Sequence, residues 1–408
     1  MALQAYVGSF MSGGGASGTT VGITGVGFEP EVVLLFGGSL RTSDASGGSG
    51  DNGFFWHGAM DANGNQFVLG NSMQDGTANS TCRFSDQNCV LWVNASDGAI
   101  NGMLAFASMD ADGFTLRVHR AFSAERVTGF IALRGLSAYK VGTFTSPVAT
   151  GVQSVTDPGF KPDTLMLVGG IPTTSDLALN NDVSISLGFV ESDGTQGCGG
   201  ISRNDGADTA SSHLLTSACL SIPANGGAGV DVAEFSAFSR FGFDLNWTTT
   251  SGSQRKVGYV ALQGADIEVV SYTSPTDTST TSVVVKAQPV GSVALHITDP
   301  GGSADAVFGF GFSSVTAQRG FFFRTLTGEC VEQYQTNACI CGSRTPGGPY
   351  DSRFTIEIEA WDANSADLDV LTNDDSDAVA ALLFFLSEKA AEAAGPNFRY
   401  VPVMAGLG

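Results

Sequence analysis

Four histidines are the residues best suited to acid–base or metal chemistry, but no two of them stand at a short spacing. They are His57, His119, His213 and His296. Local metal and acid–base motifs commonly join such residues within a few positions. A Ser–His–Asp triad is assembled from distant parts of a chain, so spacing alone does not exclude one, yet no feature of the sequence favours one. We therefore predict no catalytic residue and no metal ligand.

Acidic turns are the next candidates, because carboxylate oxygens bind cations. Residues 61–65, Asp-x-Asn-x-Asn, begin like an EF-hand calcium loop, but the Gly and Glu required at its sixth and twelfth positions are missing. Residues 110–113, Asp-x-Asp-Gly, are more typical of a hairpin turn. Residues 373–377 form the densest acidic cluster. We interpret it as a solvated loop, with a weak surface calcium site as the alternative.

Two glycine motifs, at residues 13–18 and 48–53, have the spacing of dinucleotide-binding loops. Such a loop joins a strand to a helix in a chain that alternates strands and helices, and no such alternation is visible here. Chance matches are expected in a chain with 54 Gly. No cofactor is predicted.

The cysteines are too sparse for a disulfide scaffold and contain no Cys-x-x-Cys pair. They are Cys82, Cys89, Cys198, Cys219, Cys330, Cys339 and Cys341. We expect buried or half-buried free thiols. A disulfide between Cys82 and Cys89, or between Cys198 and Cys219, is the alternative.

Exposed tryptophans are well suited to stack on a sugar ring. The chain has Trp56, Trp92, Trp247 and Trp361. We expect them in the core or at sheet edges, with glycan contact through Trp247, Trp361 and Trp56 as the alternative. An exposed Trp near a loop end would favour glycan binding, whereas four buried Trp would favour a structural role.

Composition and charge exclude several classes of function. The 408 residues carry 40 Asp+Glu against 19 Lys+Arg, a formal net charge of −21. This charge repels a phosphate backbone, so no nucleic-acid partner is predicted. No signal peptide is visible and no apolar run approaches the ~20 residues of a membrane span, so no membrane insertion is predicted. Abundant Gly with little Lys and Glu argues against a helical bundle.

The chain repeats itself, which is the strongest signal in the sequence. The matching segments are 6–10 with 140–144, 21–30 with 152–162, 112–116 with 241–245 and 130–135 with 259–264. Their agreement in order and spacing indicates a duplicated domain.

A third, more divergent copy follows. Its matching segments are 270–275 with 144–147, 289–295 with the Pro-plus-apolar strand, 353–358 with the Gly-Phe-Thr-Leu strand and 380–386 with the closing strand. We predict three domains, at 1–136, 137–265 and 266–408. The boundaries are short, so the domains should be in contact.

Each copy is predicted to be all-β. Residues 115–120 alternate apolar and polar side chains as a half-buried strand does, and residues 32–36 are continuously apolar, as in a strand buried on both faces. Frequent Asn-Gly and Asp-Gly turns favour antiparallel sandwiches. The expected fold is three tandem antiparallel β-sandwich domains with an internal repeat of about 130 residues. Only residues 387–394, before Gly395-Pro396, predict a short C-terminal helix.

The motifs of residues 141–264 resemble a β-sandwich repeat module of tailed-bacteriophage virion structural proteins. They include Val-Gly-Thr-Phe-Thr-Ser-Pro, Gly-Phe-Lys-Pro-Asp and Val-Ala-Leu-Gln-Gly, and residues 7–135 carry a variant of the series. A looser similarity to H-type lectins, which are small trimeric sandwiches, rests on Gly242–Trp247 and Phe354–Trp361. The ligand residues of those lectins cannot be placed here, so sugar binding is not implied.

The resemblance implies a non-enzymatic external protein of a phage virion, assembled in the host cytoplasm, with three sandwiches packed about a pseudo-threefold axis. We expect a tail-associated fibre or receptor-binding component that adheres through loops 39–53 and 171–182. The alternative is a capsid decoration protein seated as a pseudotrimer on a local threefold. The expected partners are tail or major capsid proteins, a host surface glycan or receptor, and further copies of the chain.

A free lectin or a glycan depolymerase is the less favoured function. A depolymerase needs two carboxylates ~5–10 Å apart in a pocket, and the sequence does not locate such a pair.

Overall fold

The computed structural model confirms an all-β fold of tandem sandwich-like units. It describes residues 2–13, 15–38, 53–74, 79–94, 96–206, 210–223, 229–297, 306–326, 329–342, 354–373 and 380–389. Within these ranges the regular secondary structure consists of β-strands alone, and all strand pairs are antiparallel. The strands group into unit 1 (β1–β10), unit 2 (β11–β21) and unit 3 (β22–β31), each with a larger inner sheet and a smaller outer sheet.

The three inner sheets each contain six strands of their own unit. In unit 1 they are β1 (Gln4–Ser12), β3 (Val32–Gly38), β4 (Gly53–Asp61), β5 (Gln66–Met73), β6 (Ser80–Ser85) and β10 (Arg126–Arg134). In unit 2 they are β11 (Ala138–Thr145), β13 (Thr164–Gly170), β15 (Val183–Val190), β16 (Gln196–Arg203), β17 (Ala210–Leu215) and β21 (Lys256–Gln263). In unit 3 they are β22 (Ala265–Thr273), β24 (Gly291–Ile297), β25 (Ala306–Ser314), β26 (Gln318–Leu326), β27 (Glu329–Gln335) and β31 (Ala380–Glu388).

The outer sheets have four strands each. In unit 1 they are β2 (Thr20–Thr24), β7 (Val90–Val93), β8 (Ile100–Asp110) and β9 (Gly113–Arg120). In unit 2 they are β12 (Gly151–Val155), β18 (Leu220–Pro223), β19 (Gly229–Ser239) and β20 (Gly242–Thr249). In unit 3 they are β23 (Thr280–Val284), β28 (Ile340–Gly342), β29 (Phe354–Trp361) and β30 (Ser365–Asn373).

The strand order is the same in every unit. The inner sheets run β1-β10-β3-β4-β5-β6, β11-β21-β13-β15-β16-β17 and β22-β31-β24-β25-β26-β27, and the outer sheets run β2-β9-β8-β7, β12-β20-β19-β18 and β23-β30-β29-β28. The one addition is β14 (Asn180–Asn181), a short strand from unit 2 that pairs with β6 of unit 1. The shared order extends the repeat to unit 3, where the sequence signal is weakest.

Backbone hydrogen bonds that recur in every unit show which residues of the three units are structurally equivalent. Before the third strand, the bonds are Glu31 N to Leu133 O, Asp163 N to Leu262 O and Val290 N to Leu386 O. In the following hairpin, they are Asp61 N to Asn65 O, Glu191 N to Thr195 O and Ser314 N to Ala317 O. Glu31, Asp163 and Val290 are therefore equivalent to one another. Asp61, Glu191 and Ser314 form a second equivalent set.

Each inner sheet separates two cores. One face of all three inner sheets contributes to a single central core, which includes Phe36 of unit 1, Leu187 of unit 2 and Phe310 of unit 3. The other face packs against the outer sheet of its own unit in a separate core. Alternate residues of a strand therefore face different cores, which explains why β3 is buried along its whole length, as predicted for residues 32–36.

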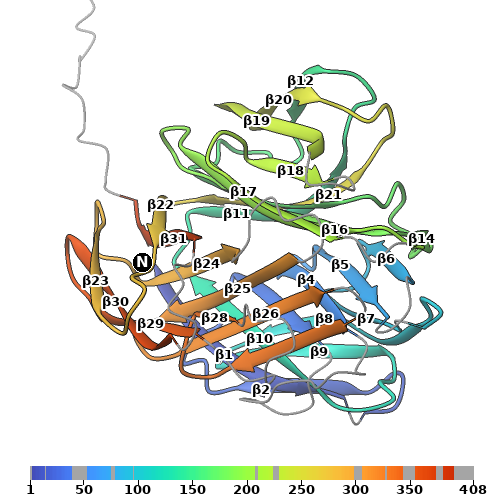
Figure 1. Ribbon diagram of the computed structural model, residues 1–408, viewed down its shortest axis with the longest axis horizontal. Helices are drawn as coiled ribbons and strands as arrows, with labels where there is room; N and C mark the ends of the chain where they lie inside the picture. Colours follow the sequence, from blue (N-terminus) through green and yellow to red (C-terminus); the bar gives the residue numbers. More distant parts are fainter. Residues whose placement is uncertain are drawn as a thin grey trace, which may run out of the picture.

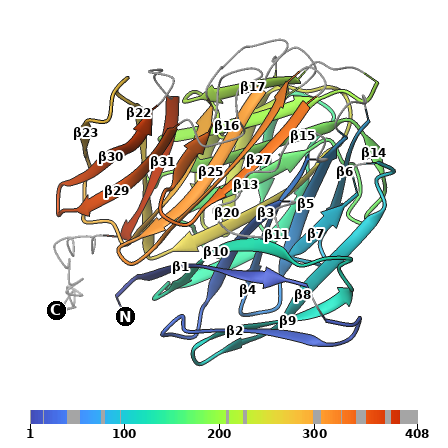
Figure 2. The same ribbon diagram turned by 60° about the horizontal axis from the view of Figure 1, so that its bottom comes forward.

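Contacts between the units follow a cycle. The first strand of unit 2, β11, lies on β4 and β5 of unit 1, and the first strand of unit 3, β22, lies on β15 of unit 2. The first strand of unit 1, β1, lies on β25 and β26 of unit 3. Figure 1 shows the outer sheets on three sides of the molecule, and Figure 2 shows the inner strands of the three units side by side. The units therefore form a closed ring with pseudo-threefold order.

Two local sequence predictions were wrong. Residues 353–358 were matched to the Gly-Phe-Thr-Leu strand, but β29 corresponds to β8 and β19, one strand earlier, and β30 takes the predicted place. Both strands of that hairpin alternate apolar and polar residues, so the pattern does not distinguish them. The helix predicted at 387–394 is wrong at its start, because Ser387 and Glu388 belong to β31 and pair with β22. Residues 390–394 lie outside the described ranges.

Candidate functional site

Three of the four histidines are enclosed in cores. His57, His213 and His296 are 6%, 8% and 0% exposed. Burial lowers the pKa of His57 to about 3 and the pKa values of His213 and His296 to about 4, so all three are neutral at pH 7. His119 faces solvent on β9, where its Nδ1 lies 2.9 Å from Asn88 Oδ1. The structure does not bring any of these rings together in a common pocket.

The cysteines form a structural motif that recurs in every unit. Cys89, Cys219 and Cys339 each begin the edge of an outer sheet, and their amide groups donate to Leu104, Ala233 and Ile356. Cys82, Cys89, Cys198, Cys219 and Cys339 are free and buried, as expected. Cys341 is buried too, and the side chain of Cys330 is not described. Burial raises the pKa of Cys339 to about 12 and also raises those of Cys89 and Cys219. Such thiols stay protonated and unreactive at neutral pH.

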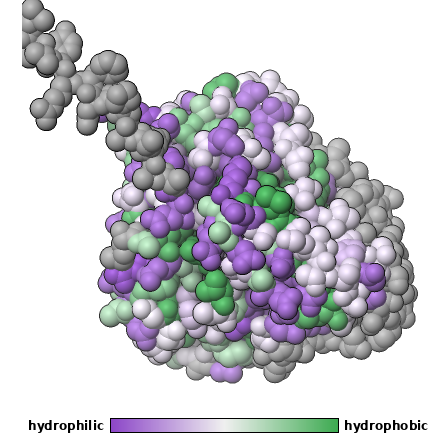
Figure 3. All heavy atoms as spheres, turned by 90° about the vertical axis from the view of Figure 1, so that its left-hand side faces the viewer, coloured by the Kyte–Doolittle hydropathy of each residue, from purple (hydrophilic) through white to green (hydrophobic). Residues whose placement is uncertain are grey.

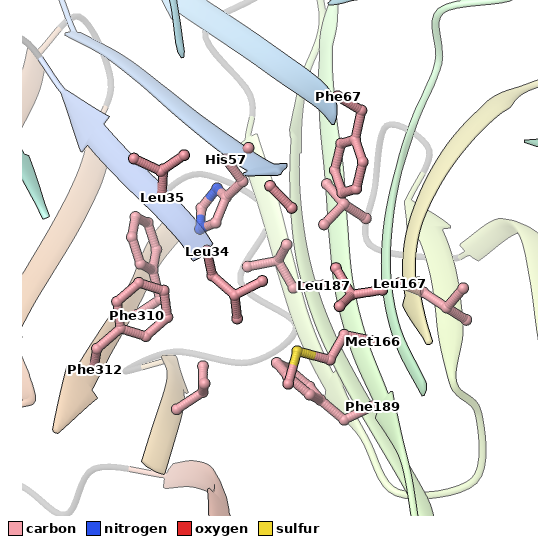
Figure 4. Close-up of a pocket in the computed structure, with 15 residues that line it drawn as sticks. Leu34, Leu35, His57, Phe67, Met166, Leu167, Leu187, Phe189, Phe310 and Phe312 are labelled. Carbon is pink, nitrogen blue, oxygen red and sulfur yellow. The ribbon is translucent and has the colours of Figure 1, made fainter. Parts of the chain in front are cut away.

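A small cavity lies where the three units meet in the central core. It measures about 40 Å³ and is lined by equivalent residues of all units, including Leu34, Met166 and Val293. His57 points into it among apolar side chains, with its ring 3.9 Å from that of Phe310 (Figure 4). The volume admits a water molecule but no substrate larger than a few atoms.

Tryptophan burial limits the predicted glycan contacts. Trp56, Trp92 and Trp247 are 2%, 5% and 1% exposed, so none of them offers an accessible ring face. Trp247 also donates its Nε1–H to Gln153 Oε1 at 2.9 Å. Trp361 is half-buried and packs edge-on against Phe385 at 6.2 Å. Of the candidate contacts Trp247, Trp361 and Trp56, only Trp361 has a surface that a ligand can reach.

The Asp-x-Asn-x-Asn motif closes the junction between units 1 and 2. Asp61 is 0% exposed, and its Oδ1 accepts the amide groups of Asn63 and Asn65 at 2.9 and 3.1 Å. Its Oδ2 accepts the amide of Val141, in the first strand of unit 2, at 2.8 Å. Lys140 adds a 3.3 Å bond to Asn65 Oδ1. The motif that looked like a calcium loop therefore joins two units through charge-assisted hydrogen bonds.

Unit 2 binds unit 3 in the same way. Glu191 is equivalent to Asp61, and its Oε1 accepts the amide of Val269, in the first strand of unit 3, at 2.6 Å. Lys286 binds Glu191 Oε2 at 2.6 Å. Burial nevertheless raises the pKa of Glu191. At each of these two junctions a second carboxylate holds the linker: Glu31 accepts Leu136 N at 2.8 Å, and Asp163 accepts Gly264 N at 2.9 Å.

Removing the first of these carboxylates should weaken the whole ring. We expect Asp61→Ala to lower the free energy of unfolding by about 3 kcal/mol, because the buried amide of Val141 and the part-buried amides of Asn63 and Asn65 lose their acceptor. The matched control is Asp97→Ala, which removes one Asx-turn bond, from Ala99 N at 2.9 Å, at an exposed position. That change should cost less than about 1 kcal/mol. Equal effects in urea unfolding would contradict the junction role of Asp61.

The third junction, between units 3 and 1, lacks both carboxylates. Val290 stands at the position of Glu31 and Asp163, and Ser314 stands at the position of Asp61 and Glu191. A groove of about 580 Å³ lies there. Its lining includes Leu3, Tyr6, Phe28, Val290, Val315 and Glu388. Figure 3 shows the side of the molecule that lies to the left in Figure 1, where small hydrophobic areas are dispersed among hydrophilic ones.

Aromatic packing in the central core holds units 1 and 3 together. Phe36 packs edge-on against Phe310 and Phe312, with ring centroids 4.7 and 4.8 Å apart. Phe55 lies 5.2 Å from Phe323. The junction is therefore closed on its inner side and open as a groove on its outer side.

The loop 171–182, which is expected to contact a receptor, lies against unit 1. Its β14 pairs with β6, and Leu177 donates its amide to Phe84 O at 3.1 Å and accepts from Arg83. Leu177 also packs against the sandwich core of unit 1. Most of this loop therefore serves as an arm between units. The other expected contact loop, 39–53, lies outside the described residues except for Gly53 in β4.

The remaining acidic candidates have local roles where they are described. Residues 111–112 form the turn between β8 and β9, which confirms the turn interpretation of residues 110–113. Asp112 accepts the amide groups of Gly25 and Gly27 at 3.0 and 2.7 Å. Of the cluster 373–377, only Asn373 is described. No group of acidic, His and Cys side chains in the described part of the chain has an arrangement that could hold a metal ion. No helix of sufficient length and apolarity to cross a membrane occurs in the same part.

Comparisons with known proteins place no further constraint on the chain. No protein-family model matches it, and no curated protein does. The site must therefore be interpreted from its own geometry, which consists of two clamped junctions, one grooved junction and a buried axial cavity.

Proposed function

We propose that this chain is a non-enzymatic structural protein on the outside of a tailed-phage particle, where it binds at a position of threefold symmetry. The observation that carries the proposal is the cyclic contact pattern, in which each first strand lies on the neighbouring unit. A ring of three similar units presents three similar surfaces around one axis. It can thus make repeated contacts with a threefold partner while being encoded as one chain.

Capsid decoration is the version of this function that we favour. A decoration protein needs a rigid body that matches a local threefold of the shell, and the shared central core provides one. The polar chemistry supports a structural role, because the carboxylates Asp61 and Glu191 are engaged with backbone amide groups and three histidines are enclosed. The negative charge of −21 would also favour contact with a basic surface of the shell.

Tail-associated receptor binding is the second candidate. It is favoured by the shared direction of equivalent strands: β3, β13 and β24 all finish at the end of the ring opposite to the hairpin turns of Asp61, Glu191 and Ser314. Strand ends gathered at one end of a rigid sandwich scaffold are a common location for binding loops. A host glycan or protein receptor would be the partner at that end.

Labelling intact particles distinguishes the two versions. An antibody against the described surface, imaged on virions by electron microscopy, should label the whole head if the chain is a decoration protein. Label confined to the tail tip or fibres would overturn decoration and support receptor binding. Particles purified from the same lysate without any label would overturn the virion proposal itself.

A further inference from the structure

We propose that the groove between units 3 and 1 is a peptide-binding groove whose occupant is the C-terminal segment of this same chain, residues 390–408. The inference is independent of the proposed function, since it concerns the ring rather than its location.

The groove exists because the pseudo-threefold order is broken in one place. At the two other junctions, a pair of carboxylates binds backbone amide groups of the incoming chain. At this junction Val290 and Ser314 replace them. Units 3 and 1 are also not consecutive in the chain, so no linker fills the space. The replacement by valine and serine removes both anionic acceptors and places the apolar side chain of Val290 in the groove lining beside the incoming strand.

The surfaces of the groove fit an extended peptide. Its floor includes residues of β1, which is an edge strand with β10 as its one neighbour in the sheet order. The walls include Phe28, Val290 and Val315, and Val315 is 63% exposed. An edge strand flanked by apolar side chains binds extended segments through main-chain hydrogen bonds and side-chain pockets. Exposed apolar grooves of this kind mark binding surfaces.

The C-terminal segment starts at the rim of the groove. Glu388, the last residue of β31, lines the groove. Lys389 is fixed by bonds from its amide to Gly264 O at 3.3 Å and from its Nζ to Asp163 Oδ1 at 2.6 Å. Residues 390–408 follow directly and include Phe398, Tyr400, Val401, Val403 and Met404. They can span up to ~60 Å when extended, and their attachment beside the groove gives them a high effective concentration there.

Hydrogen exchange tests the proposal on the full chain. Amide exchange in Gln4–Val7 should be at least tenfold slower in the full chain than in a chain ending at Lys389. The equivalent edge in unit 2, Ala138–Val141, should exchange equally in both, because it lies at another junction, where Asp61 accepts the amide of Val141. Equal exchange of Gln4–Val7 in the two chains would overturn the proposal.

A matched pair of substitutions keeps the test independent of truncation. Val315→Asp places a charge on the groove wall, whereas Val284→Asp places one on a 79% exposed valine of the outer strand β23, away from the groove lining. Val315→Asp should remove the protection of Gln4–Val7 and Val284→Asp should leave it intact. A fluorescent peptide of residues 394–408 should bind the chain ending at Lys389 and lose at least tenfold in affinity with Val315→Asp.

Two further outcomes would overturn the assignment of the occupant. Protection that rises with protein concentration together with dimer formation would show that a second copy fills the groove. Failure of the peptide to bind, with protection retained after Val315→Asp, would show that the segment acts elsewhere.

Discussion

Substitution of Gly188 by Ala should unfold or nearly unfold the protein. A Cβ added at Gly188 would lie 1.7 Å from the carbonyl oxygen of Cys219, which is backbone and cannot move aside without shifting the outer sheet. The expected loss in the free energy of unfolding is at least about 3 kcal/mol, at the upper end of overpacking effects. Urea unfolding followed by tryptophan fluorescence measures it.

The same prediction holds in the other units, because the motif recurs. A Cβ at Gly58 or Gly311 would lie 2.0 Å from the carbonyl oxygen of Cys89 or Cys339. The control is Gly22→Ala in the exposed strand β2, where the nearest atom to an added Cβ is Thr115 Oγ1 at 3.8 Å. Gly22→Ala should change stability by less than about 0.5 kcal/mol. A Gly188→Ala protein with stability close to that of Gly22→Ala would contradict the close approach of the two sheets.

Acid should destabilise the protein steeply below pH 6.5. Burial lowers the pKa of His57 to about 3 and the pKa values of His213 and His296 to about 4. The unfolded chain binds protons on these rings below their ordinary value of about 6.5, whereas the folded chain does not. The free energy of unfolding therefore falls as pH falls, with a slope approaching about 4 kcal/mol per pH unit between pH 6 and pH 4.5.

Replacing His57 with Leu should reduce that slope by about a third. Leu occupies the equivalent position in unit 2, at Leu187, so the side chain suits the central core. The neutral protein should also gain about 1–3 kcal/mol, because both ring nitrogens of His57 are buried without a hydrogen-bond partner. His119→Gln, at an exposed position, is the control and should change the slope much less. An unchanged slope in His57→Leu would contradict the burial of a neutral imidazole.

The fold could be predicted from the sequence because its signals are local and repeated. Alternation in residues 115–120, the continuous apolar run at 32–36 and the matched segments of the first two copies define strands and their order. These features reflect which faces of a strand are buried, and the sequence records burial directly. The same reasoning failed at Ser387 and Glu388, where helix-forming residues continue β31 because they pair with β22. Tertiary pairing there overrides local propensity.

The candidate site could not be predicted, because it depends on contacts between units. The sequence presents Asp61 only as the first residue of an incomplete calcium-loop motif, whereas its bond to Val141 joins positions distant in the chain. The groove arises from what Val290 and Ser314 lack relative to their equivalents, and that comparison requires the correct alignment of unit 3. One sequence signal could have aligned the third unit: Cys89, Cys219 and Cys339 recur at similar spacing, each after a turn.

A circular permutant tests the central claim, that three cyclically equivalent units form one closed ring. The permutant begins at Ser137, runs to Lys389, continues through a Gly/Ser linker of about six residues to Ala2, and ends at Leu136. Ala2 and Glu388 line the same groove, so the linker has a short path. We expect one cooperative unfolding transition, with a free energy within about 2 kcal/mol of the parent chain ending at Lys389. A permutant that lacks a cooperative transition, or that unfolds one unit separately from the others, would contradict the closed ring.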